Sequence, residues 1–202
     1  MTKNRLEAFS DGVIAIIISI MVLELKVPHG TELKDLQPLI PVFLSYVLSF
    51  VFIGIYWGNH HHLIHTVHHV NSKIIWANMH LLFWLSLIPF TTAFIREYPN
   101  LFIANACYGL VLMLASIFAV WMYHHLAFKA KLFYPEVTMH SRKKVYKQVV
   151  TGPLLFLIAI ALGLISNYIS IAIYALTPVS FMFLPQLDFD TKEEEKMKEH
   201  NA

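Results

Sequence analysis

The chain has 202 residues, of which 57% are hydrophobic and 14% charged, and its formal net charge at pH 7 is +2. This composition is typical of a protein that crosses the membrane several times, and a chain of this length holds about six spans with no separate soluble domain. The small net charge gives no reason to expect nucleic acid as a partner. Cys107 is the only cysteine, so the chain has neither an internal disulfide nor a cysteine-based zinc site.

The first apolar segment, residues 5–25, opens with the charged side chains Arg5, Glu7 and Asp11. The uncharged run that follows, Gly12 to Leu23, is about 12 residues or roughly 18 Å of helix, against a hydrocarbon core of about 30 Å. Charges are costly inside a membrane, so we expect them to be paired, hydrated or used, and the helix to lie within an assembly. A carboxylate inside the run and the lack of a small-residue cleavage site predict a retained helix, not a signal peptide.

Five further apolar segments have the length of membrane-spanning helices, and strands of this length would be anomalous. They cover residues 36–57, 74–95, 101–126, 149–165 and 168–184. Pro38 and Pro41 fall in the opening turn of the second segment, where proline is tolerated, and Pro89 lies inside the third. We therefore predict an all-α membrane protein with one six-helix transmembrane domain over residues 1–187 and a charged cytoplasmic tail over residues 188–202.

Basic residues predict the orientation of these spans. With the N-terminus inside, the outer side holds only Lys26, Lys34 and Arg96. The cytoplasmic side then holds Lys3, Arg5, Lys73, Lys129, Lys131, Arg142, Lys143, Lys144, Lys147, Lys192, Lys196 and Lys198. By the positive-inside rule, both termini of a six-span chain face the cytoplasm, and we expect a multi-pass protein of the cell inner membrane with the lipid bilayer as its surroundings.

One stripe along the first segment combines small and branched residues. On a helical wheel Gly12, Ile16, Ser19 and Leu23 fall within roughly 60°, and Asp11 lies about 100° away. Small residues allow close helix packing in membranes, whereas apolar rings can line a pore and close it by dewetting. The spacing alone favours packing and leaves the pore as the alternative.

Asp11 is interpreted as a structural anchor. Ser10 lies beside it and Arg5 two turns earlier, and a buried polar network of this kind must be fully satisfied. The third segment offers hydrogen-bonding partners in Trp76, Asn78 and His80. The alternative role for Asp11 is that of a proton-relay carboxylate.

A cluster of histidines follows the second segment, at positions 60, 61, 62, 65, 68 and 69. The pairs His61/His65 and His65/His69 have the spacing that places two imidazoles on one helix face, which suits zinc or nickel. The cluster itself contains no carboxylate or cysteine, and interfacial polar residues produce the same pattern. We therefore predict no metal cofactor, and keep these three histidines as candidate ligands and a histidine-dependent metal transporter or sensor as the alternative function.

Signatures of other functions are missing from the sequence. It has no Thr-Val-Gly-Tyr-Gly filter, no phosphate-binding Gly-rich loop, no Gly-x-Ser-x-Gly elbow and no His-Glu-x-x-His. The chain is therefore not expected to be an enzyme or to act on a soluble substrate.

The first segment contains the motif Arg5-x-x-x-Phe9-Ser10-Asp11-Gly12-Val13-x-Ala15-Ile16. With this motif it resembles the bacterial and archaeal members of the transmembrane protein 175 family of potassium channels. Supporting elements are Trp57-x-x-His60-His61, Trp76-x-Asn78 and Ser86-x-x-Pro89-Phe90. The six-segment layout is similar over nearly the whole chain.

The resemblance implies a homotetramer of six-helix subunits without a re-entrant pore loop, in which four copies of the first helix line the pore. By position, Ile16 forms the narrowest ring, Ser19 a second layer that is often threonine in the family, and Leu23 a further hydrophobic ring. These are the stripe residues, so the resemblance favours the pore over packing. It also implies that Arg5, Phe9, Ser10 and Asp11 tie the first helix to Trp76 and Asn78, with His80 as a less direct member.

The function expected from this resemblance is a potassium-permeable, weakly selective cation channel with a hydrophobic constriction, permeant potassium ions and no cofactor. Serine at position 19 has one methyl group fewer than threonine and is expected to widen or hydrate its layer. A non-conducting scaffold, in which the stripe only packs, is the further alternative.

Overall fold

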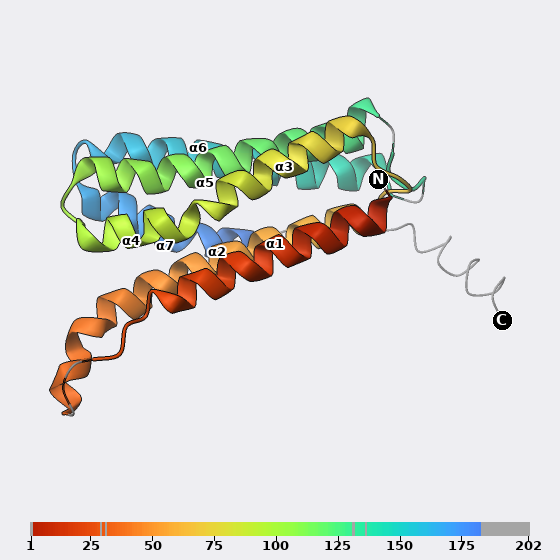
Figure 1. Ribbon diagram of the computed structural model, residues 1–202. Coiled ribbons are helices and arrows are strands. Elements are labelled where there is room, and N and C mark those ends of the chain that lie inside the picture. Colours follow the sequence, from red (N-terminus) through yellow and green to blue (C-terminus); the bar gives the residue numbers. More distant parts are fainter. Residues whose placement is uncertain (1, 29, 31, 131, 136, 183–202) are drawn as a thin grey trace.

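The computed structural model describes residues 2–28, 30, 32–130, 132–135 and 137–182, and these form a bundle of elongated helices (Figure 1). Val67 and Phe133 form an isolated antiparallel β-bridge within these ranges. The helices are α1 (Lys3–Leu23), η1 (Leu33–Leu39), α2 (Ile40–His65), α3 (Ser72–Ser86), α4 (Ile88–Glu97), α5 (Phe102–His124), η2 (His125–Lys129), α6 (Met139–Gly163) and α7 (Asn167–Met182).

Five stretches of the described chain are long and apolar enough to cross a membrane. They are Lys3–Leu23, Leu33–His65, Ser72–Glu97, Phe102–Lys129 and Met139–Gly163, and a shorter apolar helix follows at Asn167–Val179. The prediction of an all-helical membrane fold is thereby confirmed for the residues that the structure describes.

The third span is interrupted where one continuous helix was expected over residues 74–95. α3 ends at Ser86 and α4 begins at Ile88, with Leu87 between them. Pro89 causes the interruption because it has no backbone N–H to donate to the carbonyl of Leu85, and its ring crowds the preceding turn.

Two helices extend beyond the apolar segments predicted from the sequence. α2 continues from the predicted end at residue 57 to His65, so the first four histidines of the cluster lie on its last two turns. α6 begins at Met139, so the basic residues between Arg142 and Lys147 are helical. Residues 183 and 184 of the predicted sixth span, and the predicted tail 188–202, lie outside the described residues.

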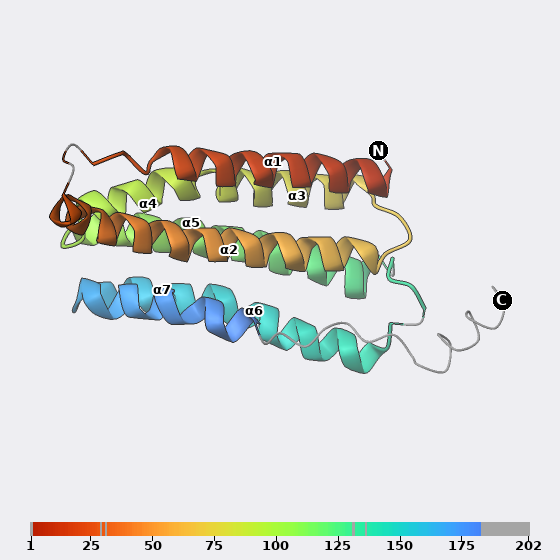
Figure 2. The ribbon, with the colours of Figure 1, turned by 90° about the horizontal axis from the view of Figure 1, so that it is seen from below.

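Helix α1 lies at one edge of the bundle, and Figure 2 shows α2 between it and the pair α6 and α7. α1 packs against α2, α3 and α4, whereas α5, α6 and α7 pack against one another. The largest fully buried side chains, Tyr108, Tyr174, Phe52 and Phe156, lie in the part of the bundle formed by α2, α5, α6 and α7. One side of α1 is therefore left without a neighbour inside the subunit.

Candidate functional site

Helix α1 has two faces of different environment. Leu6, Ser10, Ile14, Ile17 and Met21 are buried and recur every three or four residues, which makes them one helix face. The predicted stripe lies about 150° away from this face on a helical wheel. Ile16 in this stripe is 60% exposed and Leu23 is 78% exposed.

Two smaller residues complete the stripe. A Cβ atom added at Gly12 would meet nothing within 4 Å, so this glycine does not serve close packing within the subunit. The Ser19 hydroxyl donates to the Ala15 carbonyl at 2.9 Å, which leaves its oxygen able to accept a hydrogen bond from outside the helix. The stripe is thus an apolar surface with one hydroxyl, turned away from the rest of the subunit.

A buried hydrogen-bonded chain fastens α1 to α3 and α2. Asn78 Nδ2 donates to Ser10 Oγ at 2.9 Å, and Ser10 donates in turn to the Leu6 carbonyl at 2.8 Å. Asn78 Oδ1 lies 2.8 Å from His60 Nε2. Because an amide oxygen only accepts, we assign the proton of the His60 ring to Nε2. The structure thus brings together Ser10 and Asn78, two of the predicted site residues, and adds His60 from α2.

Asp11 is held by a tryptophan other than the one proposed from the sequence. Trp57 of α2 donates from Nε1 to Asp11 Oδ1 at 2.9 Å. Trp76, in contrast, is exposed on α3. A sequence cannot distinguish the two tryptophans because the choice depends on how α1 is rotated against its neighbours.

The remaining predicted members lie apart from this network in the single subunit. His80 stacks on Phe118 of α5 with ring centroids 4.7 Å apart, and its Nδ1 lies 2.7 Å from the Trp76 carbonyl oxygen. Arg5 and Phe9 are exposed on α1. The Ser10–Asn78–His60 chain therefore does not include four of the predicted residues, namely Arg5, Phe9, Trp76 and His80.

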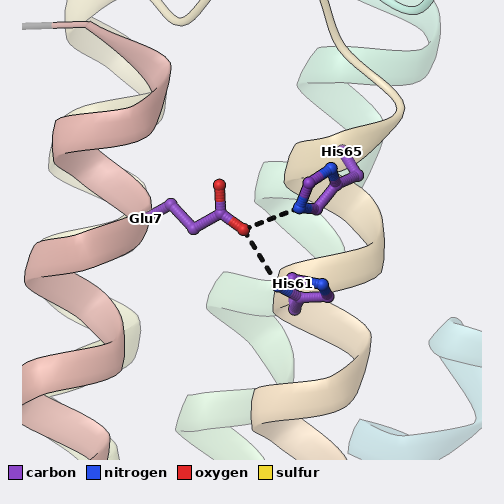
Figure 3. Close-up of side chains that lie close together, drawn as sticks. All are labelled: Glu7, His61 and His65. Atoms are coloured by element: carbon purple, nitrogen blue, oxygen red, sulfur yellow. Dashed lines mark ion pairs between the residues drawn. The ribbon is translucent and has the colours of Figure 1, made fainter.

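A second polar cluster joins the start of α1 to the end of α2 (Figure 3). Glu7 Oε1 lies 2.9 Å from His61 Nδ1 and 2.9 Å from His65 Nε2. The two rings lie one helical turn apart, with centroids separated by 4.4 Å and planes tilted by 56°. His69 does not join them, because α2 ends at His65 and the predicted helical spacing from 65 to 69 is broken.

The sequence did not predict the part that Glu7 plays in this cluster. The histidines have no carboxylate among them, and Glu7 comes from a segment more than 50 residues earlier. Its position one turn before Asp11 was the available signal, because residues four apart lie on the same flank of a helix. With Asp11 bound to Trp57, Glu7 must also face α2.

Comparison with known proteins gives consistent matches. A model of the family described as endosomal/lysosomal potassium channel TMEM175 matches residues 5–89. A potassium channel of Chryseobacterium sp. (strain P1-3) is 43% identical over 204 residues, which cover 99% of this chain and 100% of the relative. The human endosomal/lysosomal proton channel TMEM175 is 28% identical over 207 residues, which cover 91% of this chain and 41% of the human protein.

The fold is also similar to that of a solved channel. The crystal structure of a lysosomal potassium-selective channel TMEM175 homologue from Chamaesiphon minutus matches with a TM-score of 0.76 and 30% sequence identity. The match covers 89% of this chain and 96% of that one. These findings confirm the family predicted from the first-helix motif and, since the relatives are ion channels, the prediction that the chain is not an enzyme. The chain belongs to the TMEM175 family of ion channels.

Proposed function

We propose that this chain forms a homotetrameric, potassium-permeable and weakly selective cation channel whose pore is lined by four copies of α1. The observation that carries the proposal is the outward stripe of α1, with Ile16 and Leu23 exposed opposite a fully buried face. An exposed apolar stripe on a membrane helix contacts lipid, another subunit or a pore. The names of the relatives, potassium channels and a potassium-selective channel, favour the pore.

The chemistry of the stripe determines how ions pass. Four Ile16 side chains would form the narrowest ring, and a hydrocarbon ring has no ligand to replace the water around an ion. Ions therefore cross hydrated or partly hydrated, and the pore closes when the ring excludes water. The Ser19 hydroxyls would form the next layer, where an oxygen that can accept hydrogen bonds supports the hydrated ion. Discrimination between potassium and sodium is expected to be modest.

Opening requires α1 to rotate or splay. The Ser10–Asn78–His60 chain and the Trp57–Asp11 bond hold α1 to α3 and α2, so we expect it to move together with these helices or after breaking the bonds. Asp11 has the role of an anchor in this proposal, not that of an ion-binding group.

The orientation proposed from the basic residues agrees with their positions in the fold. The start of α1, the end of α2 and the start of α6 lie at the same end of the bundle (Figure 1). Lys3 and Arg142 lie at this end, whereas Arg96 lies at the end of α4, the opposite end. By the positive-inside rule, the end with the N-terminus faces the cytoplasm of a cell with an inner membrane.

Planar-bilayer recording of Ile16→Asn tests the constriction. An amide at the narrowest ring should hydrate it, raise the conductance at least several-fold and change the ratio of potassium to sodium permeability. Ile103→Asn is the matched control, since this isoleucine of α5 is also 60% exposed and lies away from α1. Unchanged conductance and selectivity in Ile16→Asn would remove Ile16 from the constriction.

A flux assay separates the channel from a non-conducting scaffold. Liposomes containing the purified protein should release potassium down its gradient before valinomycin is added. A scaffold whose stripe only packs releases potassium only after the ionophore.

A further inference from the structure

We propose that Glu7, His61 and His65 form a binding site for a divalent transition-metal ion of the zinc or nickel type, which links α1 to α2. One ligand atom from each residue lies within 4.8 Å of the other two. In tetrahedral zinc sites the metal-to-ligand distances of about 2.0–2.2 Å place ligand atoms roughly 3.4 Å apart. The two 2.9 Å separations at Glu7 Oε1 therefore need to open by only about 0.5 Å to admit an ion.

The donor atoms determine the class of metal. Two imidazole nitrogens and one carboxylate oxygen are typical of zinc sites in which three protein ligands leave a fourth position for water. Calcium and magnesium prefer six or more oxygen ligands, so the two imidazoles favour zinc, nickel and related ions over them. The ligand set is also complete within one subunit.

The site is accessible and its ligands are held in place. The His61 and His65 side chains are 46% and 55% exposed, so an ion can reach the rings, while Glu7 is 14% exposed. Trp57 stacks on the His61 ring with centroids 5.7 Å apart and is itself bonded to Asp11. Such contacts orient a ligating imidazole before the ion arrives.

One positive charge lies near the site and opposes the ion. Lys3 Nζ donates to the carbonyls of His65 at 3.4 Å and Val67 at 3.1 Å. This ammonium group lowers the affinity for a cation but does not occupy the ligand atoms. We therefore expect the site to load at micromolar, not nanomolar, concentrations of free ion.

Occupancy has a consequence for α1, and this consequence rests on the proposed function. The carboxylate ligand belongs to α1 and both imidazoles belong to α2, so a bound ion adds a direct link between the two helices. An ion that binds better to the arrangement seen here than to one with α1 displaced must stabilise the arrangement seen here. If opening requires α1 to move away from α2, zinc added on the side of the N-terminus is expected to reduce the potassium current.

Binding is tested on the full-length protein, purified with an affinity tag that contains no histidine. Zinc titration by calorimetry should give one site per subunit, and cobalt, used as a spectroscopic substitute, should give the visible absorption of a four-coordinate ion. His65→Ala should weaken binding at least tenfold and remove the cobalt signal. His69→Ala is the matched control, since His69 is exposed but lies beyond the end of α2.

A second variant guards against damage to the fold. Glu7→Gln keeps the shape of the side chain but removes its charge, and it should also weaken zinc binding at least tenfold. Two results would overturn the site. One is equal zinc affinity in the wild type and in His65→Ala, and the other is no zinc binding by the wild type at a free zinc concentration of about 100 micromolar. A protein that binds zinc but carries no potassium would overturn the proposed function and leave the site standing.

Discussion

Helix α5 packs against α3, α4, α6 and α7 within one subunit, whereas α1 packs on one side only. Tyr108 and Tyr174 are fully buried with ring centroids 5.4 Å apart, and Gly109 lets the helices approach closely around them. α1 buries Leu6 and Ile17 against its neighbours and leaves Ile16 largely exposed. The surroundings of α5 are therefore the more completely packed part of the subunit, and in the proposed tetramer α1 acquires its second set of neighbours by assembly.

The substitution Asn78→Ala tests how α1 is attached to its neighbours, and we expect it to have the largest effect. The substitution removes the two hydrogen bonds that Asn78 makes to Ser10 and His60, and it leaves the buried His60 Nε2 without an acceptor. An unsatisfied buried polar group costs about 1–3 kcal/mol, so we expect a loss of stability of about 2–4 kcal/mol. Thermal unfolding in detergent, followed by circular dichroism, measures the loss. Asn59→Ala, at an exposed position of α2, is the control, and equal unfolding temperatures for the two variants would contradict the role of the chain.

The close packing around α5 is tested by the substitution Gly109→Ala. A Cβ atom at this position would collide with the Tyr174 hydroxyl and would lie 2.7 Å from Ile160 Cγ1. Overpacking of this kind costs about 1–3 kcal/mol and should lower the unfolding temperature. Gly54→Ala, where the added atom meets nothing within 4 Å, should leave stability unchanged or improve it. A stable Gly109→Ala protein would show that α5, α6 and α7 tolerate more separation than their packing indicates.

The substitution Ser19→Thr tests the exposed stripe of α1, and we expect it to have the smallest effect. The added methyl group should narrow the second layer of the proposed pore and raise the preference for potassium over sodium. We expect a change of less than about tenfold in the permeability ratio, or under about 1.4 kcal/mol, since the Ile16 ring is unaltered. Reversal potentials in mixed salts measure the ratio. Ser86→Thr is the control, because this exposed serine of α3 also donates to its own helix, and an equal effect there would argue against a specific layer at Ser19.

The sequence predicted those features that depend on local composition. Apolar length located the spans. The helical wheel grouped Gly12, Ile16, Ser19 and Leu23 on one stripe of α1, but the spacing alone favoured packing for this stripe, and only the family resemblance favoured a pore. Hydropathy ended α2 too early and started α6 too late. The last part of α2 and the first part of α6 contain polar and basic residues that a scan for apolar segments does not register.

Features that depend on how two helices meet could be predicted only in part: Ser10 and Asn78 were expected in one network, but the tryptophan that binds Asp11 was not identified. Whether Asp11 pairs with Trp57 or Trp76 depends on the rotation of α1 against α2 and α3, which leaves no mark in a single sequence. The same rotation places Glu7 between His61 and His65. Pro89 was located inside the third span, but the break at Leu87 was not predicted from it, because a proline can also be accommodated within a kinked helix.

The interruption of the third span affects how α1 is supported along its length. Near its start α1 is bonded to α3 through Asn78, and at its far end Glu24 lies 3.9 Å from Arg96 of α4. Because Pro89 cannot donate a backbone hydrogen bond, the span bends between α3 and α4 at a lower cost than a continuous helix would. The two ends of α1 are thus supported by sections that can tilt by different amounts, and a movement at the end near Asn78 need not be passed on in full to the end near Arg96.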